Sequence, residues 1–331
     1  MIMEKRSIRQ ILRHTVVDDF KGMMNALKGG FYMLRHYKWR WGRMPSRTPM
    51  LIFNVTADFY SGGMADRFKG AVTAYAYCKQ RGIDFRIRYI YPFELSDYLL
   101  PASYDWRLKD GEYLQCIPDA RLMYARAEHG RRLLRLKPSS RQIHFYGNYN
   151  NLDVLNCKGG TDYKWGELFK ELFRPGPELE RILSCKKSEI GSEYISAVFR
   201  FQNLLGDFKE YGFRSIEDQN RRDELVSLCL AGLENLHEKY PDMPLLVTSD
   251  SYTFIQRVSS LPYVHTIGGR RVHIGSGSGE TTDTYMGSFV DFYMLAGSRM
   301  IFSLGSSEMY PTQFPMYAAK LDDVPFVRIR L

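Results

Sequence analysis

The sequence lacks the short motifs that identify several common enzyme classes. It contains no G-x-G-x-x-G loop, no G-x-x-x-x-G-K-[ST] loop, no H-E-x-x-H pair and no G-x-S-x-G elbow. These absences argue against a dinucleotide oxidoreductase, a P-loop NTPase and the ordinary hydrolases. An Asp-x-Asp pair is also missing, and the seven histidines show no metal-ligand spacing. We therefore expect no bound metal.

Cysteine is scarce, and long apolar runs are absent. The five cysteines stand singly, at Cys78, Cys116, Cys157, Cys185 and Cys229. An odd number without a C-x-x-C pair argues against a disulfide framework or a zinc ribbon and favours a reducing compartment. No run of about 18 apolar residues could cross a bilayer, and the charged start lacks a signal-peptide core. We expect a cytoplasmic protein.

Acidic residues are rare only at the start of the chain. Residues 1–50 carry 11 Lys and Arg against 3 Asp and Glu, a net charge of +8, while the whole chain carries +9. The body is therefore almost neutral. Because no nucleic-acid-binding motif accompanies the basic segment, we do not expect a nucleic-acid partner.

The basic segment, residues 1–48, has the pattern of an amphipathic helix. Apolar side chains from Ile8 to Leu34 recur every three or four residues, and Trp39 and Trp41 follow. One interpretation is an interfacial helix that attaches residues 1–41 to an anionic membrane, peripherally on its inner face. The other is a helix pair packed on the body with solvated charges. Gly29–Gly30 is expected to break or bend the helix.

After Pro49 the pattern changes to buried strands that alternate with helices. Residues 50–55 read as a strand, 56–63 as a glycine-bearing loop, 64–81 as a helix and 85–90 as the next strand. The alternation restarts at 194–199 and ends with a strand at 299–304, a helix at 308–320 and a strand at 325–329. This order predicts two doubly wound α/β domains that face a cleft.

The best candidate for an interdomain linker is the stretch 174–187, which opens with Pro-Gly-Pro. We therefore expect an N-terminal α/β domain at 49–175 and a C-terminal α/β domain at 188–331. The irregular region 91–160 contains aromatic residues that could either stack on a ligand or belong to the core.

Four loops with ligand-binding character follow predicted strands. They are residues 61–67, with two glycines before a helix, 199–208, with an arginine leaving an apolar strand, 248–251, and 303–308, with small residues before a helix. Each loop alone has an ordinary structural explanation, such as a turn or a helix cap. Their common position at the carboxyl ends of strands favours a ligand site, because open α/β sheets bind ligands there.

Three stretches resemble the GT-B fucosyltransferases that use GDP-fucose, the group of α1,2-, α1,6- and protein O-fucosyltransferases. G-G-M-A-D-R-F-K-G resembles the family's opening loop and helix, and V-F-R-F-Q-N-L-L-G-D-F resembles the strand and loop whose arginine holds the donor pyrophosphate. V-D-F-Y-M-L-A-G-S-R-M-I-F-S-L-G-S-S-E resembles the C-terminal base- and phosphate-binding stretch. Val198 stands where the family has a histidine, and Asp66 where it has an asparagine.

The resemblance implies that 49–175 is the acceptor-side domain and 188–331 the nucleotide-sugar-binding domain, and it implies roles for individual residues. Arg200 would hold the β-phosphate, Asp291 the guanine base, and Ser306 and Ser307 phosphate oxygens. The loop residues that would line the cleft from the N-terminal side are Gly62, Gly63, Asp66 and Arg67. Asp250 follows another strand and is a further candidate for donor binding.

The implied reaction is an inverting, metal-independent transfer of fucose from GDP-fucose to a glycan hydroxyl, in a surface polysaccharide or a lipid-linked precursor. Arg200 and helix N-terminal donors would stabilise the leaving GDP without a cofactor. Asp66 is the first candidate for the base and Glu308 the second. Asp66 could equally be a first-turn acid that stabilises its helix.

Two alternatives remain open on the sequence. The enzyme could use another GDP-sugar, or the chain could be a non-catalytic, membrane-associated scaffold that binds a nucleotide or glycan. Binding of GDP separates both transferases from the scaffold.

Overall fold

The computed structural model describes residues 8–41, 49–125, 141–207, 210, 212–269, 271, 274 and 282–331, without the side chains of 8–19, 21–22 and 282–284. Two compact α/β units make up the chain. The described residues of Met1–Gly62, Asp66–Tyr91 and Ser103–Lys164 form unit 1, and those of Gly63–Ala65, Pro92–Ala102 and Trp165–Leu331 form unit 2. Each unit is described by itself.

Unit 1 has a four-stranded parallel sheet in the order β3-β2-β7-β6. Its strands are β2 (Met50–Val55), β3 (Asp84–Tyr89), β6 (Ala120–Ala125) and β7 (Gln142–Gly147). Helix α2 (Met64–Arg81) connects β2 to β3, which confirms the predicted β-loop-α-β unit, and α4 (Leu152–Gly159) follows β7. The short strands β1 (Lys38–Trp39) and β5 (Cys116–Ile117) pair in parallel.

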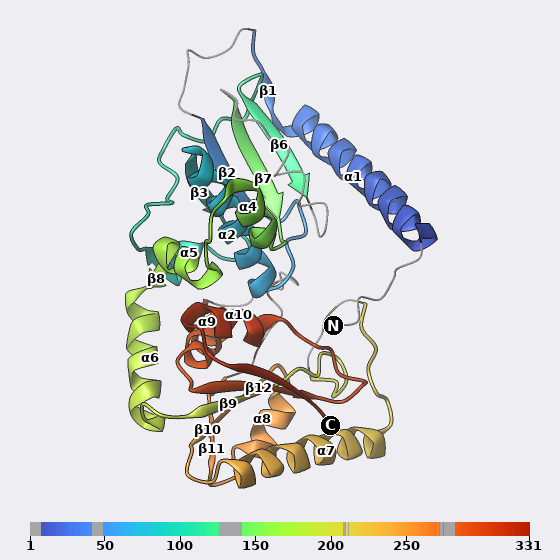
Figure 1. Ribbon diagram of the computed structural model, residues 1–331, viewed down its shortest axis with the longest axis vertical. Helices are drawn as coiled ribbons and strands as arrows, with labels where there is room; N and C mark the ends of the chain where they lie inside the picture. Colours follow the sequence, from blue (N-terminus) through green and yellow to red (C-terminus); the bar gives the residue numbers. More distant parts are fainter. Residues whose placement is uncertain are drawn as a thin grey trace. The chain divides into compact units, whose positions relative to one another are not determined.

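Helix α1 (Ile8–His36) lies along β6 in unit 1 (Figure 1). The expected break at Gly29–Gly30 is wrong, because the helix continues through both glycines. Gly29 is buried, and a Cβ atom there would lie 2.8 Å from the side chain of Leu122. A larger residue at this position would therefore displace the side chain of Leu122.

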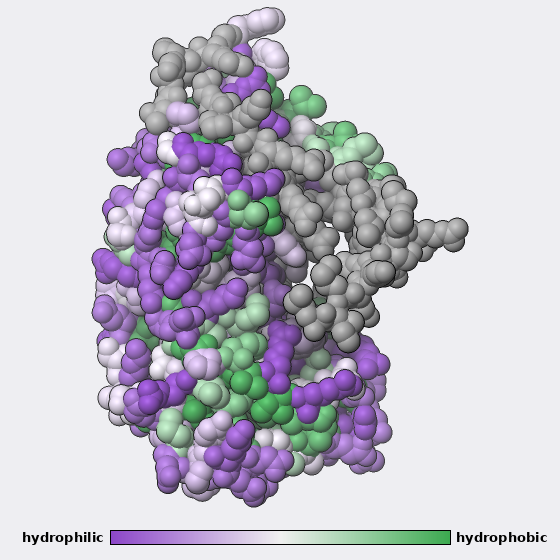
Figure 2. Space-filling model, viewed as in Figure 1, coloured by the Kyte–Doolittle hydropathy of each residue, from purple (hydrophilic) through white to green (hydrophobic). Residues whose placement is uncertain are grey.

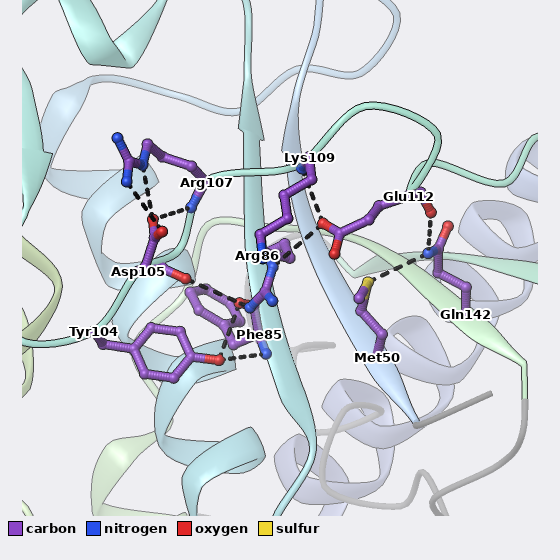
Figure 3. Close-up of polar contacts among 9 residues, drawn as sticks. All are labelled: Met50, Phe85, Arg86, Tyr104, Asp105, Arg107, Lys109, Glu112 and Gln142. Carbon is purple, nitrogen blue, oxygen red and sulfur yellow. Dashed lines mark hydrogen bonds and ion pairs between the residues drawn. The ribbon is translucent and has the colours of Figure 1, made fainter.

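The edge of the unit 1 sheet is covered by the segment that follows β3 (Figure 3). The hydroxyl of Tyr104 accepts from the Phe85 N–H at 2.8 Å and donates to the Phe85 carbonyl at 3.1 Å. These bonds satisfy backbone groups of an edge strand, which would otherwise be open to pairing with a strand of another chain. Arg86 extends beside them to Glu112, whose carboxylate lies 3.4 Å from its Nε atom. Trp106 is buried, so it belongs to the core rather than to a sugar-stacking surface.

Unit 2 has a five-stranded parallel sheet in the order β11-β10-β9-β12-β13. The strands are β9 (Ile195–Phe199), β10 (Leu245–Ser249), β11 (Val264–Thr266), β12 (Met300–Gly305) and β13 (Phe326–Arg330). Helices α7 (Gln219–Lys239) and α8 (Tyr252–Val258) lie on one face, with α9 (Thr282–Ala296) and α10 (Phe314–Asp322) on the other (Figure 1). Every residue of β9 and β10 is buried, as expected for a sheet that helices cover on both faces.

Two boundaries differ from those expected. The stretch 174–187 is no open linker: it contains the end of β8 (Phe173–Pro175), which pairs with β4 (Leu99–Pro101), and most of α6 (Pro177–Ile190). Pro177 is the first residue of α6, where a missing N–H costs nothing. The helix α5 (Trp165–Leu172) and the residues up to 175, expected in the first domain, belong to unit 2.

The helix expected at 308–320 begins only at Phe314. Pro311 and Pro315 explain the difference, because a proline inside a helix removes a hydrogen bond and clashes with the preceding turn. Pro315 lies in the first turn of α10, where it is tolerated. Residues 306–313 form a turn and a loop instead.

A buried histidine makes the stability of unit 1 depend on pH. The Nε2 atom of His144 lies 2.7 Å from the side-chain oxygen of Gln142, so this nitrogen carries the proton, and the Tyr37 hydroxyl donates to Nδ1. Burial lowers the pKa of His144 from 6.5 to about 3. The folded protein therefore keeps His144 neutral where the unfolded chain would bind a proton.

We expect the free energy of unfolding to fall as the pH drops below 6.5, by about 1.4 kcal/mol per pH unit from this group. At pH 5 the loss is about 2 kcal/mol. Urea unfolding at several pH values measures it. His144→Gln should flatten this dependence, whereas His36→Gln, at an exposed position on α1, should retain it. An unchanged slope in His144→Gln would refute the assignment.

Candidate functional site

The order in which the chain adds strands to the unit 2 sheet reverses at β9, the central strand. From β9 the chain adds β10 and β11 on one side and then returns to add β12 and β13 on the other. In such sheets the crevice outside the carboxyl ends of the two diverging strands is a preferred ligand site. Phe199 pairs with Ser249 of β10 and with Leu304 of β12. The residues that follow these three strands are therefore neighbours at one edge.

Arg200, the first residue after β9, is held between two carboxylates. Its Nη1 atom lies 3.0 Å from Oδ2 of Asp250, and its Nη2 atom lies 2.7 Å from Oε2 of Glu210. The Arg200 side chain is 21% exposed, and that of Asp250 only 4%. The sequence predicted both Arg200 and Asp250 as site residues, and the structure brings them into direct contact.

Asp250 fixes the backbone after β9. Its Oδ1 atom accepts from the N–H of Phe201 at 2.8 Å, and its Oδ2 atom from the N–H of Gln202 at 2.7 Å. Gln202 has a φ of 54°, a left-handed conformation that costs free energy in a non-glycine residue. Burial raises the pKa of Asp250, while Arg200 and the backbone N–H groups oppose this rise. The carboxylate therefore holds the chain in the turn that presents Arg200.

Glu210 reaches Arg200 from a loop that an asparagine ties down. The side chain of Asn203 donates to the carbonyl of Glu210 at 2.8 Å and accepts from its N–H at 2.7 Å. The Glu210 carboxylate is 14% exposed and also accepts from the Gln202 side chain at 3.3 Å. The sequence analysis missed Glu210, because nothing in its local pattern separates it from a surface acid.

The residues after β10 support a helix rather than offer free donors. Ser251 caps α8 by accepting from the N–H of Phe254 at 3.1 Å, and its hydroxyl donates to Asp207 at 2.9 Å. Asp207 also accepts from the N–H of Thr253 at 2.6 Å. This carboxylate, seven residues after Arg200, therefore holds the 200–207 loop against the start of α8.

The residues after β12 form a tight turn. The hydroxyl of Ser306 accepts from the N–H of Glu308 at 3.3 Å, and Ser307 is exposed. Glu308, the second candidate for the base, pairs with Arg221 of α7 at 2.9 Å. The hydrogen bond from Arg221 lowers the pKa of Glu308, so this carboxylate is a weaker base than an ordinary glutamate.

Asp291 of α9 is held by an arginine that the sequence analysis missed. Arg271 donates from Nε to Asp291 at 2.6 Å and from Nη2 to the other carboxylate oxygen at 2.9 Å. Both side chains are about nine-tenths buried. Arg271 also donates to the backbone carbonyls of Gly268 and Gly269. The pair fixes the Asp291 carboxylate in one orientation.

The predicted first loop lies in the chain between β2 and α2. Asp66 is in the first turn of α2 and pairs with Lys69 at 2.5 Å, so the helix-stabilising interpretation of Asp66 has direct support. The side chain remains 39% exposed. Gly62 has a φ of 76°, and a Cβ atom there would lie 2.4 Å from the Asp66 carboxylate. The adjacent Gly63 is partly exposed.

Arg67 is buried and braces this loop. Its Nε donates to the Gly62 carbonyl at 3.0 Å, and Nη1 donates to the Tyr89 hydroxyl and the Tyr91 carbonyl, both at 2.7 Å. With 2% of its surface exposed, Arg67 ties the loop to the end of β3. Its contacts favour a positioning role over direct contact with a ligand.

No group of three or more His, Cys, Asp or Glu side chains within the described ranges is arranged to hold a metal ion. Arg200 and Arg271, two of the described basic side chains between β9 and α9, are suited instead to anionic or acceptor-rich ligands.

Asp250→Ala should strongly destabilise unit 2. The substitution removes the partner of Arg200 and of two buried N–H groups, and breaking a buried ion pair from one side costs about 3–5 kcal/mol. Chemical unfolding measures the loss. Asp242→Ala, at an exposed position before β10, should change the free energy of unfolding by less than about 0.5 kcal/mol. Equal effects of the two variants would contradict the bracing role of Asp250.

No protein-family model matches the sequence, and no curated protein matches it. Solved structures do match. The fucosyltransferase NodZ from Bradyrhizobium aligns with a TM-score of 0.52 and 13% identity, over 85% of this chain and 95% of that chain. NodZ alpha-1,6-fucosyltransferase co-crystallised with GDP aligns with a TM-score of 0.50 and 13% identity, over 86% and 95%. The chain therefore has the GT-B-like fold of these fucosyltransferases, as the sequence predicted.

Proposed function

We propose that this protein is a glycosyltransferase that moves fucose from GDP-fucose to a hydroxyl of a glycan, in a surface polysaccharide or a lipid-linked precursor. The observation that carries the proposal is the position of Arg200. It leaves the central strand of a switch-point sheet, in a fold shared with a fucosyltransferase that was co-crystallised with GDP.

The β-phosphate of the donor is the proposed ligand of Arg200. A guanidinium has five N–H donors in a fixed fork, so one arginine can hold a carboxylate and a phosphate together. Asp250 lies behind the guanidinium and keeps it in place. Glu210, on its loop, occupies a position on Arg200 that a phosphate oxygen can take. Donor binding would then exchange the Glu210 carboxylate for the phosphate.

The remaining donor contacts belong to the loops after β12 and before α2 and to α9. Ser306 and Ser307 would donate hydroxyl hydrogen bonds to phosphate oxygens. Asp291 would accept from the guanine N–H groups, because a carboxylate keeps lone pairs beyond those that one arginine uses. The backbone at Gly62 and Gly63 would approach the donor closely, with Arg67 holding that loop in shape.

The proposed reaction breaks the bond between the fucose anomeric carbon and the β-phosphate oxygen. The acceptor hydroxyl forms the new bond from the opposite face, its proton passes to a carboxylate, and GDP leaves with the electron pair. Attack from the opposite face makes the scheme inverting. Arg200 and hydroxyl donors would stabilise the negative charge that develops on GDP, so the scheme calls for no metal.

Asp66 is the proposed base. Both candidates pair with a cation, but Asp66 is 39% exposed against 25% for Glu308, and the hydrogen bond from Arg221 lowers the pKa of Glu308. Lys69 then has the role of holding the Asp66 carboxylate in one orientation.

Titration calorimetry with GDP tests the donor site through two variants that should change the affinity for GDP in opposite directions. Arg200→Lys keeps the charge but loses the fork, and should weaken GDP binding by about tenfold or more. Glu210→Gln removes the competing carboxylate and should tighten GDP binding. Arg257→Ala, on the exposed side of α8, is the matched control and should bind as the unmodified chain does.

If Arg200→Lys folds and binds GDP with unchanged affinity, the donor site lies elsewhere. If GDP does not bind the unmodified chain at all, the transferase proposal fails. Binding of GDP without transfer from GDP-fucose would favour another GDP-sugar or a scaffold, and a thermal-shift screen of GDP- and UDP-sugars distinguishes these.

The base is tested by steady-state kinetics of fucose transfer. Asp66→Asn should lower kcat by about 100-fold or more with little change in the KM for GDP-fucose, since general-base catalysis contributes on that scale. Glu308→Gln should retain most of kcat. The reverse ranking would transfer the role of the base to Glu308.

A further inference from the structure

Large apolar side chains on α1 lie on the side of the helix that does not pack on the unit 1 sheet, and they are exposed. Each of them has another such side chain three or four residues away, so they form a single stripe along the helix. The members of this α1 stripe are Phe20, Met23, Met24, Leu27, Phe31 and Leu34, and each is between 49% and 76% exposed. The stripe is part of the hydrophobic patch at the upper right of Figure 2.

The opposite side of the same helix is fixed to unit 1. The Tyr32 hydroxyl donates to Asp58 at 2.9 Å, its ring packs on Phe59, and the Leu122 N–H donates to the sulfur of Met33 at 3.2 Å. With a rotation of about 100° per residue, Gly29, Tyr32 and Met33 lie across the helix from the stripe. Helix α1 therefore has two apolar sides, of which the described part of the chain covers one.

The surroundings of the stripe are basic and aromatic. Residues 20–41 contain five Lys and Arg and no Asp or Glu. Arg35 and Lys38 are exposed beside or just after the stripe, whereas Lys28 lies over the rings of Phe59 and Tyr124 and Arg40 pairs with Asp119. Trp39 and Trp41, just past the end of α1, are 65% and 90% exposed. Tryptophan at such exposure is costly in water but favourable at the boundary between lipid headgroups and acyl chains.

We propose that the α1 stripe, with Trp39 and Trp41, docks on an anionic membrane surface. The helix would lie in the plane of the interface, with its apolar side among the acyl chains and its basic residues at the headgroups. No helix among the described residues is long and apolar enough to cross a membrane. Because the other side of α1 is anchored to β6, attachment of the helix would attach unit 1 itself.

A second copy of this chain is the competing occupant, since steps of three and four residues also suit a helix pair. Charge argues against it. Two stripes facing each other would bring the basic residues of both chains together with no acid in residues 20–41 of either. An anionic lipid surface would instead compensate the exposed Arg35 and Lys38.

The test is flotation of the full chain with phosphatidylcholine vesicles that contain or lack phosphatidylglycerol. Deleting α1 is unsuitable, because its inner side covers β6. Leu27→Glu/Phe31→Glu places two charges on the stripe, and Leu228→Glu on α7, where the leucine is 42% exposed, is the matched control. The unmodified chain and the control should bind the anionic vesicles, and the double variant about 100-fold more weakly. Removing phosphatidylglycerol should weaken binding about tenfold or more.

The proposal is overturned if the unmodified chain does not float with anionic vesicles, or if the double variant floats equally well. It is also overturned if light scattering shows a dimer that the double variant dissociates while neither binds vesicles. GDP affinity and circular dichroism of the double variant should match those of the unmodified chain. They establish that the variant is folded and separate this proposal from the proposed donor site, which can fail independently.

Discussion

The buried carboxylate of Asp250 organises the carboxyl edge of the unit 2 sheet. One side chain binds the guanidinium of Arg200 and two consecutive backbone N–H groups, so it joins the end of β10 to the turn after β9. A buried charge of this kind is tolerated only when its partners are complete. The left-handed Gln202 and the direction of Arg200 both depend on this arrangement.

Two arginines near the proposed donor contacts, Arg200 and Arg271, are already held by carboxylates. Arg271 is paired through two hydrogen bonds to Asp291, and Arg200 is shared between Asp250 and Glu210. Such pairing positions a guanidinium before a ligand arrives, at the cost of a competitor that the ligand has to displace or join. Buried Asp250 acts as a support in this scheme, and the loop carboxylate of Glu210 as the competitor.

Periodicity predicted the strands and most helices well, because alternating apolar runs and turn residues are local signals: β2, α2 and β12 lie within a residue or so of their expected positions. The same patterns placed Arg200 and Asp250 at strand ends. Pairings between distant residues carry no local signal, so Glu210, Arg271 and Arg221 were missed. The helix predicted from 308 failed where two prolines outweighed the apolar pattern. One side of α1 packs on the sheet, as a single helix rather than the expected helix pair, while attachment of its exposed side to a membrane stays a proposal.

A crystal structure of the protein with GDP tests the central claim most directly. The account predicts the pyrophosphate at the carboxyl ends of β9 and β12, with its β-phosphate on Arg200, the Glu210 carboxylate displaced from that guanidinium, and Asp250 unmoved. A pyrophosphate bound away from Arg200, or an Arg200 still bound to Glu210 with GDP present, would contradict it.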